Sequence, residues 1–384
     1  MDKTVPKHIR LKQEIKSWID NGTLRSGDLL PSENDIAQRF QMSRQTVRQA
    51  LGALEQEGLL SRQQGKGTYV SESFTPAQTA EAEFTEPKTI GVLTTYISDY
   101  IFPHIVRGIE SELRRHGYRL VLSSTDNDKE RERESLEMLL REPLSGLIVE
   151  PTRSALGNPN FSYYASLDYK GIPYLMINET YPELNCPYVK LDDELGGYLA
   201  AEHLLRLGHR SVAGFFKTDD MQGVQRLKGF LRAHHELGVP LRPELIVQYK
   251  TEDKQHTPHQ AALRLLAESE QRPTAFVCYN DELAVRLLDA ARSQGLSVPG
   301  QLSLVGFDDS PLATATEVKL TTLVHPKTVM GEASARLLIQ MIERRRTTGT
   351  SREAEGGEDA TVEPIVYKPE LVVRESSAPP AGQT

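Results

Sequence analysis

The sequence lacks the features of a membrane, secreted or metal-binding protein. No stretch approaches the roughly 18 uninterrupted apolar residues that a transmembrane helix needs. The N-terminal stretch carries charges but neither an apolar core nor a small-residue cleavage site, so we expect no secretory signal. The two cysteines, Cys186 and Cys278, form no close-spaced metal or redox pair. We therefore expect a cytoplasmic protein that holds no metal.

Several enzyme signatures are missing too. The sequence has no G-x-G-x-x-G after a predicted strand, no G-x-x-x-x-G-K-[ST] phosphate loop, no H-E-x-x-H and no G-x-S-x-G elbow. These absences argue against dinucleotide-dependent, nucleotide-hydrolysing, zinc-protease and serine-hydrolase activities. We predict that the protein is not an enzyme and needs no cofactor.

The charges that are present are unevenly distributed. The net charge is −8, yet residues 1–70 carry eleven Lys and Arg against eight Asp and Glu. A basic N-terminal part on an acidic body is typical of a protein in which only that part meets phosphates. The length of 384 residues allows two or three compact units.

Residues 1–70 show the pattern of a winged helix-turn-helix domain. Apolar residues at helical spacing up to Ile19 predict a first helix. Ser32 and Ser43 are N-cap residues for a second and a third helix, with a tight turn between them. After Gly58, two short strands flank a glycine-rich tip.

The start of the third helix carries side chains suited to reading DNA. Arg44 and Arg48 are four residues apart, so they lie on one exposed face, with Gln45 beside them. Arginine pairs with the major-groove edge of guanine and glutamine with that of adenine. Hydroxyls and a glycine-rich tip suit the DNA backbone. The candidates are Ser43, Arg44, Gln45, Thr46, Arg48, Gln64, Gly65, Lys66 and Gly67. The alternative is that the two arginines merely solvate a surface helix.

Residues 71–88 are polar and acidic without an apolar period, which predicts a linker. From 89 to 374 strands alternate with helices, which indicates parallel sheets covered by helices on both faces. The segment is too long for one small doubly wound sheet, so we predict an α/β domain of two such lobes. The predicted strands are 89–95, 119–123, 146–149, 172–177, 188–191, 211–216, 245–248, 274–278, 302–306 and 365–373.

Two segments near the C-terminus depart from this alternation. The run 347–363 is charged, glycine-rich and without apolar period, which predicts a disordered insertion. The last residues, 375–384, are predicted to be a flexible tail.

Polar side chains recur where the predicted strands end. Ligands of such folds bind outside the carboxyl ends of the strands, in the crevice between lobes. The strand-end candidates are Tyr96, Asp99, Glu150, Asn178, Asn280, Asp281 and Asp308. Carboxylates and amides pair well with the hydroxyls of a sugar, and aromatic faces pack on its C–H surface.

The motifs carry two family resemblances. LPSE at 30–33, SRQTVRQAL at 43–51, EGL at 57–59 and GKGTYV at 65–70 resemble the GntR-type winged helix. VRGIE at 106–110, EHLL at 202–205, RLKGF at 226–230, NDELA at 280–284 and GFDD at 306–309 resemble the sensor domain of LacI/GalR-type regulators and periplasmic sugar-binding proteins.

The combination resembles the arabinose-responsive repressors of Gram-positive bacteria, notably in TTYISDYIFPHIVRGIE at 94–110 and KTDDMQGVQRLKGF at 217–230. The resemblance implies a homodimer that binds a roughly palindromic operator and is released by L-arabinose. It adds Glu33 to the DNA-facing set. It also implies that Arg226 and Asp281 bind sugar hydroxyls and that Phe102 packs on the ring.

Alternatives stay open at several positions. Asp281 and Asp308 could instead cap a turn or helix, Arg226 could form a surface ion pair, and Tyr96 and Phe102 could be core residues. His325, before Pro326, could line the crevice or pack a hinge. For the whole protein, the alternatives are a regulator of another pentose or hexose, a sugar-binding protein without regulatory coupling, and an enzyme that uses crevice carboxylates.

Overall fold

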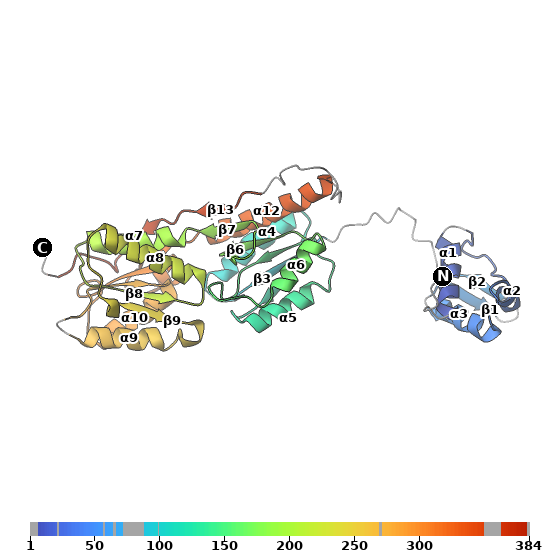
Figure 1. The fold of residues 1–384 in the computed structure, drawn as a ribbon, viewed down its shortest axis with the longest axis horizontal. Helices are drawn as coiled ribbons and strands as arrows, with labels where there is room; N and C mark the ends of the chain where they lie inside the picture. The colour runs from blue at the N-terminus through green and yellow to red at the C-terminus, as the bar shows by residue number, and fades with distance from the viewer. Residues whose placement is uncertain are drawn as a thin grey trace. The chain divides into compact units, whose positions relative to one another are not determined.

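The computed structural model describes residues 7–20, 23–56, 58–63, 67–71, 88–98, 100–268, 271–348 and 362–381. The chain divides into two compact units, Met1–Glu86 and Pro87–Thr384, here called the head and the body. Figure 1 shows the elements of each unit.

The head is a winged helix-turn-helix. Its elements are α1 (Lys7–Asp20), α2 (Glu33–Arg39), α3 (Arg44–Gln56), β1 (Leu60–Gln63) and β2 (Gly67–Val70), the last two forming an antiparallel hairpin. Ser32 caps α2 through the backbone N–H of Asp35, and the Ser43 hydroxyl accepts from the backbone N–H of Thr46 at the start of α3. Both predicted N-caps are therefore confirmed.

The body contains two six-stranded sheets, each in its own lobe. The first has the order β13-β7-β6-β5-β3-β4, and the second β14-β12-β11-β10-β8-β9. The first-lobe strands are β3 (Thr89–Thr94), β4 (Arg119–Ser124), β5 (Gly146–Val149), β6 (Tyr174–Asn178), β7 (Tyr188–Leu191) and β13 (Ile365–Tyr367). The second-lobe strands are β8 (Val212–Lys217), β9 (Ile246–Tyr249), β10 (Ala275–Cys278), β11 (Ser303–Asp308), β12 (Thr321–Val324) and β14 (Leu371–Val372). All pairings are parallel except β12 with β14.

Helices cover both faces of each sheet, as the alternation predicted (Figure 1). In the first lobe, α4 (Phe102–Arg115) and α12 (Lys327–Thr348) lie on one face, and α5 (Lys129–Leu139) and α6 (Phe161–Tyr169) on the other. In the second, α7 (Asp193–Arg206) and α8 (Met221–Glu236) lie opposite α9 (Thr257–Ala267) and α10 (Asp281–Ser293), with the short α11 (Leu312–Ala315) nearby. The residues of the inner strands β3, β5, β6 and β11 are nearly all buried, since each sheet is covered by helices on both faces.

Several elements differ from the prediction. Sequence periodicity did not identify α6, α11 or β12. The single predicted strand 365–373 is two strands, β13 in the first lobe and β14 in the second. Pro369 lies between them, and proline cannot donate to a strand ladder, so the chain leaves one sheet there and joins the other.

The predicted flexible tail is wrong for residues 375–381. Ser376 is fully buried, and its Oγ donates to the Leu304 carbonyl at 2.6 Å and accepts from the Thr321 N–H at 2.8 Å. The Ser303 hydroxyl donates to the Ala378 carbonyl. Because these bonds satisfy backbone and side-chain groups of β11 and β12, the tail belongs to the second lobe. Residues 382–384 lie outside the described residues.

The other segment predictions are tested only at their edges. The Ser71 N–H donates to the Leu59 carbonyl, so Ser71 belongs to the head, whereas 72–87 of the predicted linker lie outside the described residues. Helix α12 extends to Thr348, and 349–361 of the predicted insertion are likewise not described.

Helices α7 and α8 meet at two glycines. A Cβ on Gly197 would overlap the carbonyl of Arg226, and one on Gly229 would overlap the carbonyl of Glu194. These close approaches hold the backbone of Arg226 against α7.

We expect Gly229→Ala to lower the free energy of unfolding of the body by about 1–3 kcal/mol, because the methyl group must push two helix backbones apart. Urea unfolding followed by far-UV circular dichroism measures the change. Gly157→Ala, where the added Cβ meets no atom within 4 Å, is the matched control and should differ little from wild type. Equal stability of the two variants would contradict the packing argument.

Candidate functional site

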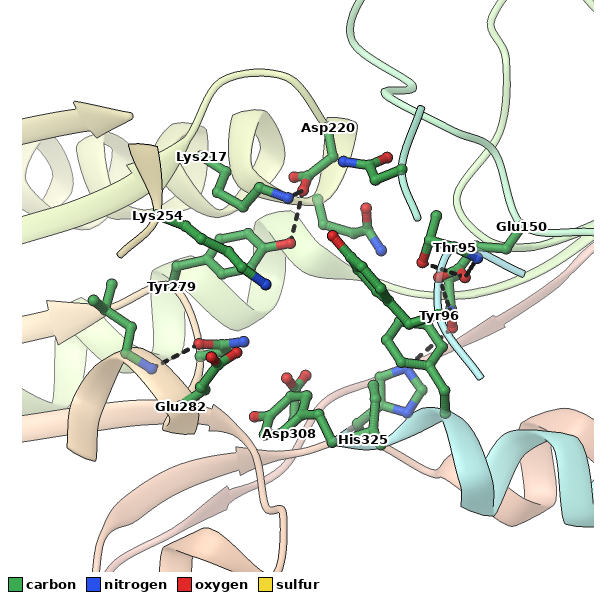
Figure 2. A pocket seen from close by; sticks show the side chains of 18 of the residues that line it. Thr95, Tyr96, Glu150, Lys217, Asp220, Lys254, Tyr279, Glu282, Asp308 and His325 are labelled. Carbon is green, nitrogen blue, oxygen red and sulfur yellow. Dashed lines mark hydrogen bonds and ion pairs between the residues drawn. The ribbon is translucent and has the colours of Figure 1, made fainter. Parts of the chain in front are cut away.

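A cavity of about 520 Å³ lies between the two lobes, at the carboxyl ends of their parallel strands. Tyr96 and Glu150 follow strands β3 and β5 of the first lobe, while Lys217 ends β8 and Asp308 ends β11 of the second. Figure 2 shows these side chains around the cavity. In this architecture a ligand is expected to bind where the carboxyl ends of strands from the two sheets meet.

Most of the predicted site residues line this cavity. They are Tyr96, Phe102, Glu150, Asn178, Arg226, Asn280, Asp308 and His325. Asn280 also caps α10, because its Oδ1 accepts from the Leu283 N–H. Asp99 lies outside the described residues.

Asp281 is not part of the cavity wall. Its carboxylate accepts from the Thr322 hydroxyl at 2.6 Å and from the Ser310 N–H at 2.8 Å, and the residue is fully buried. Burial raises the pKa of Asp281 to about 7. This differs from the expectation that Asp281 contacts a sugar hydroxyl directly: in this structure its carboxylate joins the loop after β11 to strand β12 and does not line the cavity.

Arg226 is the centre of the second-lobe wall. Its Nε donates to Asp193 Oδ1 at 2.7 Å, its Nη1 donates to the Tyr279 carbonyl at 2.6 Å, and Nη2 lies 3.7 Å from Asp308 Oδ1. The guanidinium stacks 3.5 Å from the centroid of the Phe307 ring. Burial disfavours its charge, but the two carboxylates outweigh burial and raise the pKa of Arg226. The surface ion pair considered for Arg226 is thus replaced by a buried network.

A hydrogen-bonded chain forms the first-lobe wall. Glu150 accepts from the N–H and the hydroxyl of Thr95, both at 2.7 Å, and from Asn178 Nδ2, also at 2.7 Å. Since Asn178 Nδ2 serves Glu150, its Oδ1 is left as the acceptor for His325 Nε2 at 3.3 Å. His325 then carries its proton on Nε2. The buried Nδ1 is an acceptor with no hydrogen-bond partner among the described residues.

His325 is held neutral. Burial, followed by the charges of Lys327 and Arg226, lowers the pKa of His325 to about 3. A neutral imidazole can accept a hydrogen bond at Nδ1, whereas an imidazolium cannot.

Two cavity residues at strand ends have left-handed backbones. Asn178 has φ 69° at the end of β6, and Asp308 has φ 96° at the end of β11. Such conformations are uncommon outside glycine and persist where the surrounding structure imposes them, typically at ligand clamps. Both side chains line the cavity.

Other wall residues were missed from the sequence. Lys217 Nζ lies 2.7 Å from Asp220 Oδ2, which also accepts from the Tyr279 hydroxyl at 2.9 Å (Figure 2). Lys254 lies 5.1 Å above the Tyr96 ring. Lys217 and Tyr279 sit at strand ends, so the rule that identified Glu150 could have found them. Lys254 comes from an irregular loop and carries no such signal.

Direct bonds join the lobes around the cavity. Arg153 of the first lobe pairs with Glu252 of the second at 2.6 Å, and Asn127 Nδ2 donates to the Thr251 hydroxyl at 2.8 Å. On another side, the Tyr100 hydroxyl donates to the Phe307 carbonyl at 2.9 Å. A ligand in the cavity would therefore contact both lobes at once.

The head presents its own candidate surface on α3. Arg44, Gln45 and Arg48 are exposed, while the opposite face of the helix packs into the core through Val47 and Leu51. The Ser43 and Thr46 hydroxyls bond each other at 2.8 Å in an exposed position. An exposed polar face beside the N-terminus of a rigidly packed helix suits entry into a DNA groove.

The remaining predicted head residues are placed unevenly. Glu33 lies beside this surface, and its carboxylate pairs with Arg48. Gly67 starts β2 with φ 122° and an exposed backbone, whereas Gln64, Gly65 and Lys66 lie outside the described residues.

Comparison with known proteins agrees with this division. The family model of bacterial regulatory proteins of the gntR family matches residues 8–70, and the periplasmic binding protein-like domain matches residues 201–377. An arabinose metabolism transcriptional repressor of Geobacillus stearothermophilus is 56% identical over 98% of this chain and 99% of its own. One of Halalkalibacterium halodurans is 45% identical over 97% and 96%. The chain belongs to this family of transcriptional repressors.

Members of this repressor family are not enzymes, which confirms the prediction made from missing motifs. A LacI family regulator from Enterococcus faecium, solved with bound ribose, has 27% identity and a TM-score of 0.61 over 76% of this chain and 99% of its own. The regulator CcpA of Lactococcus lactis, 24% identical with a TM-score of 0.64 over 75% and 98%, shares the fold. Within the described ranges, no helix is long and apolar enough to cross a membrane. Nor do the described side chains include three or more His, Cys, Asp or Glu grouped to hold a metal ion.

The depressed pKa of His325 generates a pH prediction. Between about pH 3 and pH 6.5 the unfolded chain binds a proton at this histidine that the folded protein does not, so acid costs the folded state stability in that window. His325→Gln removes this dependence. When the pH falls from about 7.5 to 5.5, we expect the free energy of unfolding of this variant to decrease by about 1.4 kcal/mol less than that of the wild-type protein. Urea unfolding at both values measures it, and parallel losses in the two proteins would refute a neutral buried His325.

Proposed function

We propose that the protein is a repressor that binds operator DNA as a homodimer and leaves it when L-arabinose occupies the cavity between the lobes. The observation that carries the proposal is a cavity between the lobes, lined by polar and aromatic side chains, in a chain that also has a winged-helix head. Support for the effector comes from the relative of 56% identity, which is named an arabinose metabolism transcriptional repressor.

The cavity chemistry favours a small polyol. A pentose offers several hydroxyls, each both donor and acceptor, and the walls supply both partners: guanidinium donors from Arg226 and carboxylate acceptors from Asp308. The Tyr96 and Phe102 rings, whose centroids are 5.5 Å apart, offer an apolar surface for the C–H face of a sugar. A cavity of about 520 Å³ is within the usual range for small-molecule sites.

Release follows from linkage between the two sites. A sugar that contacts both lobes stabilises the arrangement in which they are bonded together, as Arg153–Glu252 and Tyr100–Phe307 bond them here. If that arrangement of the body suits DNA less well, sugar lowers operator affinity, and DNA lowers sugar affinity by the same factor.

Two heads account for operator specificity. One α3 helix reads only a few base pairs, whereas two heads on a dimer read half-sites about one helical turn apart and gain from both. Action on chromosomal operators places the protein in the cytoplasm.

Operator binding at fixed salt, titrated with L-arabinose and then with D-galactose, D-xylose and D-ribose, tests the proposal. We expect L-arabinose alone to lower the affinity. Release by a different sugar would keep the linkage and replace the effector. Indifference to every sugar, or no sequence-selective DNA binding, would overturn the proposed function. Salt is held constant because phosphate contacts make affinity salt-dependent.

Two substitutions should separate the sites. Arg44→Ala is expected to cost about 1–3 kcal/mol of operator binding and to relax readout at one base position, with sugar affinity unchanged. Arg226→Lys should keep operator affinity but weaken sugar binding by about 2 kcal/mol or more, because an ammonium cannot reproduce the fork shared by Asp193 and the Tyr279 carbonyl. Calorimetry and DNA-binding anisotropy measure the two effects, and the reverse pattern would show that the assignments are wrong.

A further inference from the structure

The operator-facing side of the head contains an arginine outside the predicted DNA-binding set. Glu33, the first residue of α2, accepts from Arg48 Nη2 at 3.0 Å through one carboxylate oxygen and from Arg62 Nη2 at 3.2 Å through the other. Its side chain is only 15% exposed, whereas those of Arg48 and Arg62 are 63% and 54% exposed. One carboxylate thus ties the recognition helix to the first strand of the wing.

The position of Arg62 on β1 explains why it reaches α2. Side chains two residues apart on a strand share a face. Leu60 is buried in the head core, so Arg62 leaves the strand on the side that faces the helices, just beyond the edge of that core. It therefore reaches from the wing hairpin to Glu33 on α2.

The charge of this cluster is positive. Arg44, Arg48 and Arg62 all act electrostatically on Glu33, and the Arg48 hydrogen bond with these charges keeps the pKa of that carboxyl below its usual value. Three guanidinium groups around one carboxylate leave an excess of two positive charges. A bare carboxylate facing DNA would be repelled by phosphate, but here it is neutralised and still leaves further donors on both arginines.

We propose that Arg62 binds a phosphate of the operator backbone, and that Glu33 is a positioning residue that holds Arg48 and Arg62 at a fixed spacing. Arg48 reads base edges, and Arg62 spans the gap between the groove and the wing with a sequence-independent contact. The inference rests on the proposed operator binding. Ion pairs with arginines this exposed contribute little to the stability of the fold, so a purely structural role would have little effect on binding.

The test uses the full-length protein, a duplex that it selects from a random pool, and a random-sequence duplex of the same length. Binding is measured from about 50 to 200 mM salt. We expect Arg62→Ala to weaken binding of both duplexes by about fivefold near 150 mM and to reduce the slope of log K against log salt by about one. Arg62→Lys should restore most of the slope, since an ammonium also contacts phosphate.

Arg25→Ala is the matched control. Arg25 is exposed and lies two residues before Gly27, whose N–H donates to the Val70 carbonyl at the end of the hairpin opposite the wing tip. The Arg25→Ala variant should bind DNA with the same slope of log K against log salt as the wild-type protein.

Comparison in the Glu33→Gln background separates contact from positioning. A direct phosphate contact predicts that Arg62→Ala still reduces the slope in that background. If Arg62 acts only by holding Glu33 and Arg48, the added substitution will change nothing there, and the proposed contact is overturned. An unchanged slope in the Arg62→Ala single variant overturns it too, while wild-type protein that selects no sequence would instead overturn the proposed function.

Discussion

The buried guanidinium of Arg226 is the interaction on which the body depends. It takes three partners from three separate segments: Asp193 at the start of α7, the Tyr279 carbonyl after β10, and Asp308 at the end of β11. A charge this deep is tolerated only when its donors are satisfied, because removing one partner leaves an uncompensated ion away from water. The glycine contacts between α7 and α8 allow the arginine backbone to approach closely enough for this network to form.

The same constraint shapes the rest of the cavity. With Asp193 and Asp308 gathered around one cation, the second lobe presents a wall of fixed polar groups. The opposite wall contains a chain of hydrogen bonds that runs from Thr95 through Glu150 and Asn178 to the neutral His325. Because each member is oriented by its neighbour, a ligand meets preorganised donors and acceptors, which reduces the entropy that binding would otherwise cost.

The head solves a different electrostatic problem. The exposed arginines around Glu33 repel one another. Glu33 relieves part of that repulsion while leaving Arg48 and Arg62 mostly exposed. Only the head carries an excess of positive side chains, so electrostatic attraction to nucleic acid is confined to the head and does not extend to the acidic body.

Much of this organisation was readable from the sequence. Serine caps, helical and strand periods and a short turn determined the winged helix, and strand-end polar residues identified most of the cavity wall, because both signals are local and follow from backbone geometry. Tertiary structure alone decided which of two strand-end carboxylates lines the cavity. Asp308 does, whereas Asp281 bonds Thr322 and Ser310. It also anchored the tail through Ser376, and it brought Arg62 to Glu33, twenty-nine residues away in sequence. Such pairings depend on which strands and loops become neighbours, and no local period records that.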